Sequence, residues 1–154
     1  HNFLMKMTSR HGLYNSLGVI VEDALVVSVL IFGGILERFP GLKACIAHGG
    51  GGACYAMGRL DRGWESRSGE ARDHIQKPPS EYQRRLYYDC ITGNEAALRF
   101  LLDQVGADRV VLGSDWPFVP WNPSPVAWVQ RLTSLSTDEK ERILWRNVEG
   151  LLGL

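Results

Sequence analysis

The stretch that decides the fold is Leu42-Lys43-Ala44-Cys45-Ile46-Ala47-His48, a short apolar run that ends in a histidine and is followed by Gly49 to Gly52. A second run, Arg109-Val110-Val111-Leu112-Gly113-Ser114, ends in Asp115. A strand that is covered on both faces reads as a continuous apolar run. Because α/β barrels carry their catalytic groups at the carboxyl ends of such strands, the two runs predict one site built from successive βα units.

The composition is that of one ordinary globular domain. The chain has 154 residues, 45% of them hydrophobic, with 17 basic and 17 acidic side chains. A zero net charge gives no electrostatic reason to expect nucleic acid or an anionic membrane as a partner. The apolar stretch Ala24 to Ile31 is too short to span a bilayer. We expect no leader sequence, a cytoplasmic location and inert thiols at the three cysteines.

Helices and strands alternate along the chain. The expected order is a helix at 19–39, the strand that ends at His48, a helix at 53–64, a polar loop at 65–80, a strand at 86–91, a helix at 94–105, the strand that ends at Asp115, and short C-terminal helices. Such alternation is typical of βαβ units and a parallel sheet. A complete (β/α)8 barrel needs about 250 residues.

The fold class that we predict is therefore α/β, the C-terminal part of a TIM barrel with about strands 6 to 8 and their flanking helices. We expect residues 1–154 to be one portion of that domain, with its N-terminal half absent. The chain starts with His1 rather than Met, and for that reason also we expect a piece of a longer protein.

Two residues at the strand ends are candidates for chemistry. His48 could ligate a metal or act as a base near neutral pH, or it could be a structural histidine bonded to backbone. The glycines that follow it would let a ligand approach the backbone closely. The Asp115 carboxylate is costly to desolvate unless it binds a cation or accepts hydrogen bonds. The alternative for Asp115 is an ordinary turn or N-cap aspartate.

Other candidates are weaker when judged from the residues alone. Arg59, eleven positions after His48, could clamp a substrate carboxylate, although spacing alone favours a surface ion pair. His1 stands where nothing local can be argued. His48, Asp115 and His1 together fall short of the usual ligand set of a catalytic zinc. A helix is expected to begin near Thr137, with that residue as its cap.

Several strings resemble a known family. ILERFPGLKACIAHGGG at 35–51, GRLDRGWESR at 58–67, YYDCIT at 87–92 and ALRFLLDQVGADRVVLGSDWPF at 97–118 look like the C-terminal half of the amidohydrolase-related, metal-dependent decarboxylases. These are relatives of aminocarboxymuconate-semialdehyde decarboxylase. The resemblance implies a distorted TIM barrel that holds one divalent metal ion, zinc or manganese.

The resemblance also implies roles for single residues. His48 matches a histidine beside the metal that acts on water or substrate, and Asp115 matches a metal ligand. His1 falls where a further histidine ligand belongs, although Asn2 stands where the family has proline. Arg59 matches an arginine that binds substrate carboxylate in the neighbouring subunit, which implies a homodimer. We also expect Trp116 to contact the substrate.

The leading hypothesis is a non-oxidative decarboxylase of an aromatic or unsaturated carboxylic acid. One alternative keeps the site and changes the reaction to hydrolysis of a lactone or an amide. Another is that the chain as it stands is a catalytically inactive partial domain, because the family's first-strand HxH or ExH motif and its N-terminal substrate arginine are absent from this sequence.

Overall fold

Three short parallel strands lie at the centre of the fold. The computed structural model describes residues 8–67, 69, 72–119 and 122–154. The strands are β1 (Cys45–Ile46), β2 (Tyr87–Asp89) and β3 (Val110–Val111), in the order β1-β2-β3. Ile46 pairs with Tyr88, and Tyr88 pairs with Val110. The predicted α/β class and parallel sheet are confirmed, although each ladder is shorter than its apolar run.

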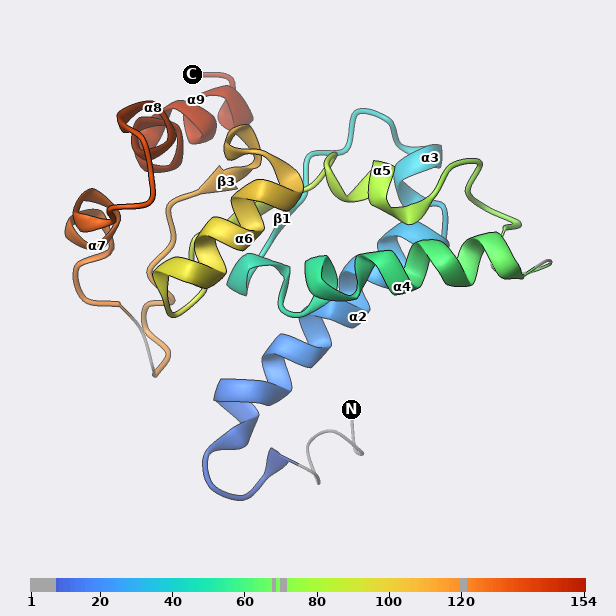
Figure 1. Cartoon of the computed structure of the whole chain (residues 1–154), viewed down its shortest axis with the longest axis horizontal. Helices are drawn as coiled ribbons and strands as arrows, with labels where there is room; N and C mark the ends of the chain where they lie inside the picture. The colour runs from blue at the N-terminus through green and yellow to red at the C-terminus, as the bar shows by residue number, and fades with distance from the viewer. Residues whose placement is uncertain (1–7, 68, 70–71, 120–121) are drawn as a thin grey trace.

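Helices connect and cover the strands (Figure 1). The α-helices are α2 (Val19–Phe32), α3 (Ile35–Arg38), α4 (Ala53–Ser66), α5 (Pro79–Gln83), α6 (Glu95–Val105), α7 (Pro125–Arg131), α8 (Thr137–Glu141) and α9 (Asn147–Leu152). Short 3-10 or π turns are η1 (Tyr14–Gly18), η2 (His48–Gly50), η4 (Ala107–Arg109) and η5 (Arg142–Arg146). In Figure 1, α7, α8 and α9 gather at one end, and α2 runs obliquely past α4, with the start of α2 projecting from the rest.

Helix α6 forms where the sequence predicts it. Its apolar stripe is fully buried and consists of Leu98, Leu101, Leu102 and Val105. The Asn94 side chain caps the helix by accepting a hydrogen bond from the Ala97 amide at 2.9 Å. Gly106, with a φ of 94°, ends it in a conformation that favours glycine.

The expectation of a single helix at 19–39 is wrong. The structure has α2 and α3 with a break at Gly33 and Gly34, because Gly34 adopts a left-handed φ of 68°. A Cβ at Gly34 would lie 2.7 Å from the carbonyl oxygen of His74, so this glycine also permits a close packing contact. The loop expected at 65–80 ends earlier than predicted, since Pro79 occupies the first turn of α5.

One apolar helical stretch is longer than the run Ala24 to Ile31 that stands out in the sequence. Tyr14–Phe32 spans 19 residues with a mean hydropathy of 1.9, so by length and composition it could cross a membrane. Length and composition do not separate a membrane span from a core helix of a folded domain. Val27 and Ile31 of α2 are completely buried, and α2 contacts η2, α4 and α5. In this structure α2 packs against the domain along one side, and only 17% of its apolar window is buried.

The cysteines are free, and two of the three are buried. Cys54 and Cys90 lie in the core, whereas Cys45 on β1 is exposed. Burial raises the pKa of the Cys54 and Cys90 thiols to about 11, which leaves them protonated and unreactive near neutral pH. The expectation of buried thiols is confirmed for these two and is wrong for Cys45, which is exposed.

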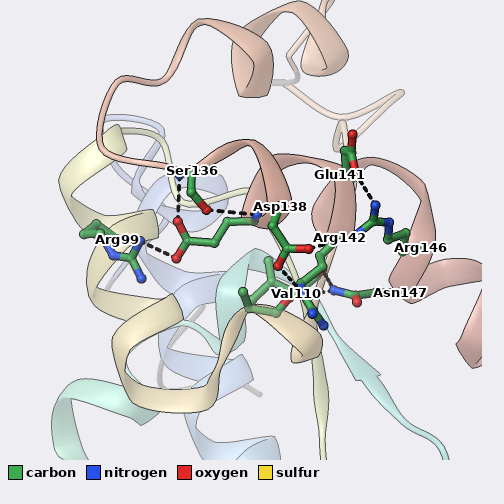
Figure 2. A network of polar contacts seen from close by, with 10 residues as sticks. Arg99, Val110, Ser136, Asp138, Glu141, Arg142, Arg146 and Asn147 are labelled. Atoms are coloured by element: carbon green, nitrogen blue, oxygen red, sulfur yellow. Dashed lines mark hydrogen bonds and ion pairs between the residues drawn. The ribbon is translucent and has the colours of Figure 1, made fainter.

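A polar network fastens the C-terminal helices to the sheet (Figure 2). Arg99 on α6 donates to Glu139 on α8 at 2.7 Å. The Asn147 amide donates to the carbonyl oxygens of Ala107 and Val110, both at 2.7 Å. Because Asn147 is buried and Val110 lies on β3, these two bonds hold α9 against the edge of the sheet.

Candidate active site

His48 and Asp115 meet at the carboxyl end of the sheet. They follow β1 and β3, which flank β2, and His48 Nε2 lies 3.4 Å from Asp115 Oδ1. Both residues have a positive φ, 52° for His48 and 66° for Asp115. Non-glycine residues rarely adopt this conformation, and it is concentrated at functional sites, where the surrounding structure enforces it.

Asp89 enforces the backbone of His48. Its Oδ2 accepts the His48 amide, and its Oδ1 accepts the amides of Gly49 and Ile91, each at 3.0 Å. Burial raises the pKa of the Asp89 carboxyl, and the three backbone donors oppose that effect by stabilising the ionised form. Asp89 thus fixes the turn that points His48 across the sheet.

Asp23 holds the other end of the His48 ring. Its Oδ2 lies 2.7 Å from His48 Nδ1, and both side chains are about a fifth exposed, at 20% and 18%. The sequence alone pointed to neither Asp23 nor Asp89 as a site residue. An acidic residue inside each of two apolar segments was the available signal, but nothing in the sequence connects positions 23 or 89 with position 48.

The glycine run serves close packing, and Gly49 and Gly51 also line a cavity beside His48, which is consistent with the interpretation that the run lets a ligand approach the backbone. A Cβ at Gly51 would lie 2.0 Å from the carbonyl oxygen of Ile20, and one at Gly50 would lie 2.7 Å from the Tyr88 ring. A Cβ at Gly49 would lie 3.0 Å from Thr92. On the side where a side chain would stand, these three glycines are covered by the protein, and they let α2 and the sheet approach η2 closely.

Electrostatics favour the protonated imidazole at His48. Partial burial lowers the pKa of His48, but the hydrogen bond from its ring to Asp23 and the charges of Asp23, Asp89 and Asp115 outweigh burial, so the pKa is raised above its ordinary value. A histidine in such surroundings can hold a proton near neutral pH and deliver it to a neighbouring group.

A cavity of about 430 Å³ opens beside the pair. His48 and Asp115 contribute its charged groups, and its apolar lining includes Ile20, Ile91, Phe100 and Leu101. Ligand sites combine mostly apolar walls with a few polar groups that orient the ligand. The arrangement suits a small molecule with an apolar ring face and one polar or charged end.

The remaining predicted site residues are not at this cavity. Arg59 lies on the exposed side of α4 and does not line the cavity, and no ion pair of Arg59 occurs within the described residues. Trp116 directly follows Asp115, but its side chain is 70% exposed and does not line the cavity either. His1 lies outside the residues that the structure describes.

The Asp115 carboxylate fits a divalent cation as part of a larger ligand set. In the part of the chain that the structure describes, its one recorded side-chain contact is the long one to His48 Nε2. A carboxylate oxygen is a common ligand of zinc and manganese, and this one faces a cavity with little else to neutralise it. No group of three or more His, Cys, Asp and Glu within residues 8–67, 69, 72–119 and 122–154 could hold a metal by itself.

Comparison with known proteins identifies the class to which this α/β chain belongs. The family model described as Amidohydrolase matches residues 7–154. The chain belongs to this amidohydrolase family.

The relatives that it resembles are decarboxylases. It is 34% identical to the 2-amino-3-carboxymuconate-6-semialdehyde decarboxylase of Dictyostelium discoideum over 89% of this chain and 38% of that protein. The Caenorhabditis elegans enzyme of the same name is 31% identical over 89% of this chain and 34% of its own length. The chain therefore spans little more than a third of these relatives.

Solved structures show the same fold. The dihydroxybenzoic acid decarboxylase of Polaromonas, solved with manganese and the inhibitor 2-nitroresorcinol, superposes with a TM-score of 0.74 at 25% identity and covers 85% of this chain and 40% of its own. The 5-carboxyvanillate decarboxylase of Novosphingobium aromaticivorans gives a TM-score of 0.81 at 22% identity, over 97% of this chain and 44% of that one.

Proposed function

We propose that the chain is the C-terminal portion of a metal-dependent decarboxylase that acts on an aromatic or unsaturated carboxylic acid. The observation that carries the proposal is the contact of His48 with Asp115 at the mouth of an apolar cavity. The decarboxylase names of the relatives support it. In this proposal the three βα units are the last three of a (β/α)8 barrel, and residues 1–154 form one part of that domain.

Asp115 would hold the divalent ion, zinc or manganese, together with ligands such as His1 from beyond the described residues. The ion would orient the substrate and stabilise negative charge that develops on it. Manganese is favoured by its presence in the Polaromonas structure.

His48 would supply the proton. During decarboxylation the bond between carbon and carboxylate breaks, carbon dioxide leaves, and the electron pair stays on the carbon. That carbon must then take a proton, and His48 Nε2 faces the cavity where the carbon would lie. Ile20, Ile91 and Leu101 would pack against the faces of the substrate and exclude water.

We extend the proposal to the assembly. Arg59, exposed on α4, would bind a substrate carboxylate in the second subunit of a homodimer, since a guanidinium matches a carboxylate with two parallel hydrogen bonds. Trp116, exposed beside Asp115, would contact substrate in the complete protein. The free cysteines are compatible with a cytoplasmic location.

The test is release of carbon dioxide by the complete protein from a panel of aromatic and unsaturated acids, with zinc or manganese supplied. We expect Asp115→Ala to lose both metal and turnover, and His48→Ala to lose turnover while keeping metal. Asp103→Asn, an exposed change on α6 away from the cavity, is the matched control. Unchanged turnover in either site variant would refute the proposal.

Hydrolysis of a lactone or an amide is the second candidate. It is favoured by the family to which the chain belongs and by the putative amidohydrolase of Staphylococcus aureus, which superposes with a TM-score of 0.71 at 26% identity over 88% of this chain and 42% of its own. The metal and His48 would then activate a water molecule instead of delivering a proton to carbon. Lactones and amides added to the same panel separate the two reactions directly.

A further inference from the structure

The contact between Asp23 and His48 carries an inference beyond the reaction itself. We propose that Asp23 is a positioning residue, which fixes the ring of His48 and keeps its proton-bearing Nδ1 turned away from the cavity. Nε2 is then the nitrogen presented to the substrate. This inference rests on the proposed function, because it assigns the proton-transferring atom of the same site.

The geometry of the contact defines the tautomer. An ionised carboxylate only accepts hydrogen bonds, so at 2.7 Å from Asp23 Oδ2 the Nδ1 atom of His48 must carry a hydrogen. The longer contact of Nε2 with Asp115 Oδ1, at 3.4 Å, likewise needs a hydrogen on Nε2 and therefore belongs to the imidazolium. When the ring is neutral, the shorter bond to Asp23 keeps the hydrogen on Nδ1, and Nε2 is the bare nitrogen. The described lining of the cavity includes His48 and Asp115 but not Asp23. Asp23 thus acts through the histidine and does not touch substrate.

The fold brings Asp23 to this position by a close approach of two backbones. The Ile20 carbonyl of α2 occupies the place that a Cβ at Gly51 would need, so the first turn of α2 lies directly against the chain that follows His48. Asp23 stands one helical turn after Ile20, on the same side of the helix. The glycine run and the carboxylate on α2 therefore belong to one arrangement.

Two carboxylates restrain His48 independently. Asp89 binds the backbone amides of His48 and Gly49, while Asp23 binds the imidazole. With the backbone fixed by Asp89, rotation of the ring about its side-chain bonds is the freedom that remains, and the hydrogen bond to Asp23 removes it. A carboxylate that orients a histidine in this way selects both the tautomer and the direction of its reactive nitrogen.

The kinetic experiment compares three variants of the complete, metal-loaded protein. We expect Asp23→Asn to lower kcat by about 10- to 100-fold, the usual cost of removing a partner that orients a reactive group, with KM and metal content unchanged. Asp23→Glu retains an accepting carboxylate and should recover part of the lost kcat. Asp103→Asn, the same chemical change on the exposed side of α6, should leave kcat at the wild-type value.

A spectroscopic experiment separates positioning from structural support and from the reaction. In protein labelled with ¹⁵N-histidine, with His48→Ala used to assign the signals, long-range proton–nitrogen spectra at alkaline pH report which ring nitrogen carries the proton. We expect the proton on Nδ1 in the wild type and a mixture of tautomers in Asp23→Asn.

The outcomes decide the inference in either direction. A proton on Nε2 in the wild type would overturn it, as would wild-type kcat in Asp23→Asn or equal loss of metal and folding in Asp23→Asn and Asp23→Glu. If no acid is decarboxylated and yet Nδ1 carries the proton, the proposed reaction fails while the positioning of His48 by Asp23 stands.

Discussion

At the scale of single residues, this site depends on positions where the backbone is forced into a conformation that most side chains avoid. His48 and Asp115 have positive φ angles, and Gly49, Gly50 and Gly51 do as well. The three backbone bonds to Asp89 stabilise the turn at His48. The site residues are therefore placed by their neighbours, and the neighbouring glycines are as necessary as the charged groups.

Gly51 and Gly52 form a matched pair that tests this view. Gly51→Ala should lower the free energy of unfolding by about 2 to 4 kcal/mol, because a side chain at a φ of 59° is strained and its Cβ would lie 2.0 Å from the Ile20 carbonyl oxygen. Gly52 has a φ of −87° and open space around it, so Gly52→Ala should change stability by less than about 1 kcal/mol. Denaturant titration measures both, and equal losses would contradict the packing role of Gly51.

Residues differ in how visible their roles are in the sequence. His48 and Asp115 could be predicted because each follows an apolar run, and parallel strands bring their carboxyl ends together. Asp23 and Asp89 could not, because their partner lies 25 and 41 positions away and each has an ordinary local explanation. The glycine run was visible, but Ile20, whose carbonyl oxygen lies where a Cβ of Gly51 would stand, precedes Gly51 by 31 positions.

At the scale of elements, local capping decides boundaries that hydrophobic spacing leaves open. The helix expected to begin at Thr137 does so, but its cap is Ser136, whose hydroxyl accepts the Glu139 amide while the Glu139 carboxylate accepts the Ser136 amide. This reciprocal pair is a complete capping box, so the choice of Thr137 as the cap was wrong. In the same way, Gly34 makes α3 a separate helix and Pro79 starts α5 earlier than expected. At each of these boundaries a single residue outweighs the hydrophobic periodicity around it.

Glu139 predicts a pH dependence of stability. Partial burial raises the pKa of Glu139, but the hydrogen bonds from Arg99 and Ser136 outweigh it and bring the pKa below its ordinary value of 4.5. A carboxyl whose folded-state pKa is lowered stabilises the fold above its unfolded pKa, and that stabilisation is lost as pH falls through the folded value. Acid below the ordinary glutamate range should therefore weaken the attachment of α8 to α6.

Glu139→Gln isolates the charge, because glutamine can also complete a capping box. We expect Glu139→Gln to lower the free energy of unfolding by about 1 kcal/mol at neutral pH, because the ion pair that it removes is partly exposed to solvent. In acid, where Glu139 is itself protonated, the free energy of unfolding of the variant should approach that of the wild type. Asp103, the other acidic partner of Arg99, is 58% exposed. The control variant Asp103→Asn should therefore change the free energy of unfolding by roughly 0.2 to 0.5 kcal/mol. Denaturation curves over a pH series measure this, and a difference that persists in acid would argue against the charge.

At the scale of the whole molecule, the described surfaces match a domain with further neighbours. The apolar side chains of Leu25, Val26 and Val29 on α2 are about half exposed or more, at 53%, 48% and 66%. These three residues lie within about one turn of α2, and an exposed apolar patch marks an interaction site for another protein surface, a ligand or a membrane. In the proposed barrel, the portion that this chain does not span would cover α2 and pair with the outer strands β1 and β3.

Metal binding distinguishes the chain from the complete protein. A catalytic zinc takes three protein ligands and leaves one position open. Among the residues that the structure describes, Asp115 is the proposed ligand and no cluster of three is present. We expect equilibrium dialysis of the 154-residue chain against zinc or manganese to show no tight stoichiometric binding, and the complete protein to bind one ion.

Asp115→Asn should abolish that binding in the complete protein, and His48→Asn should preserve it. Tight binding of one ion by the 154-residue chain would mean that the ligand set is complete within it, and that the proposed division of the site between two parts of the barrel is wrong.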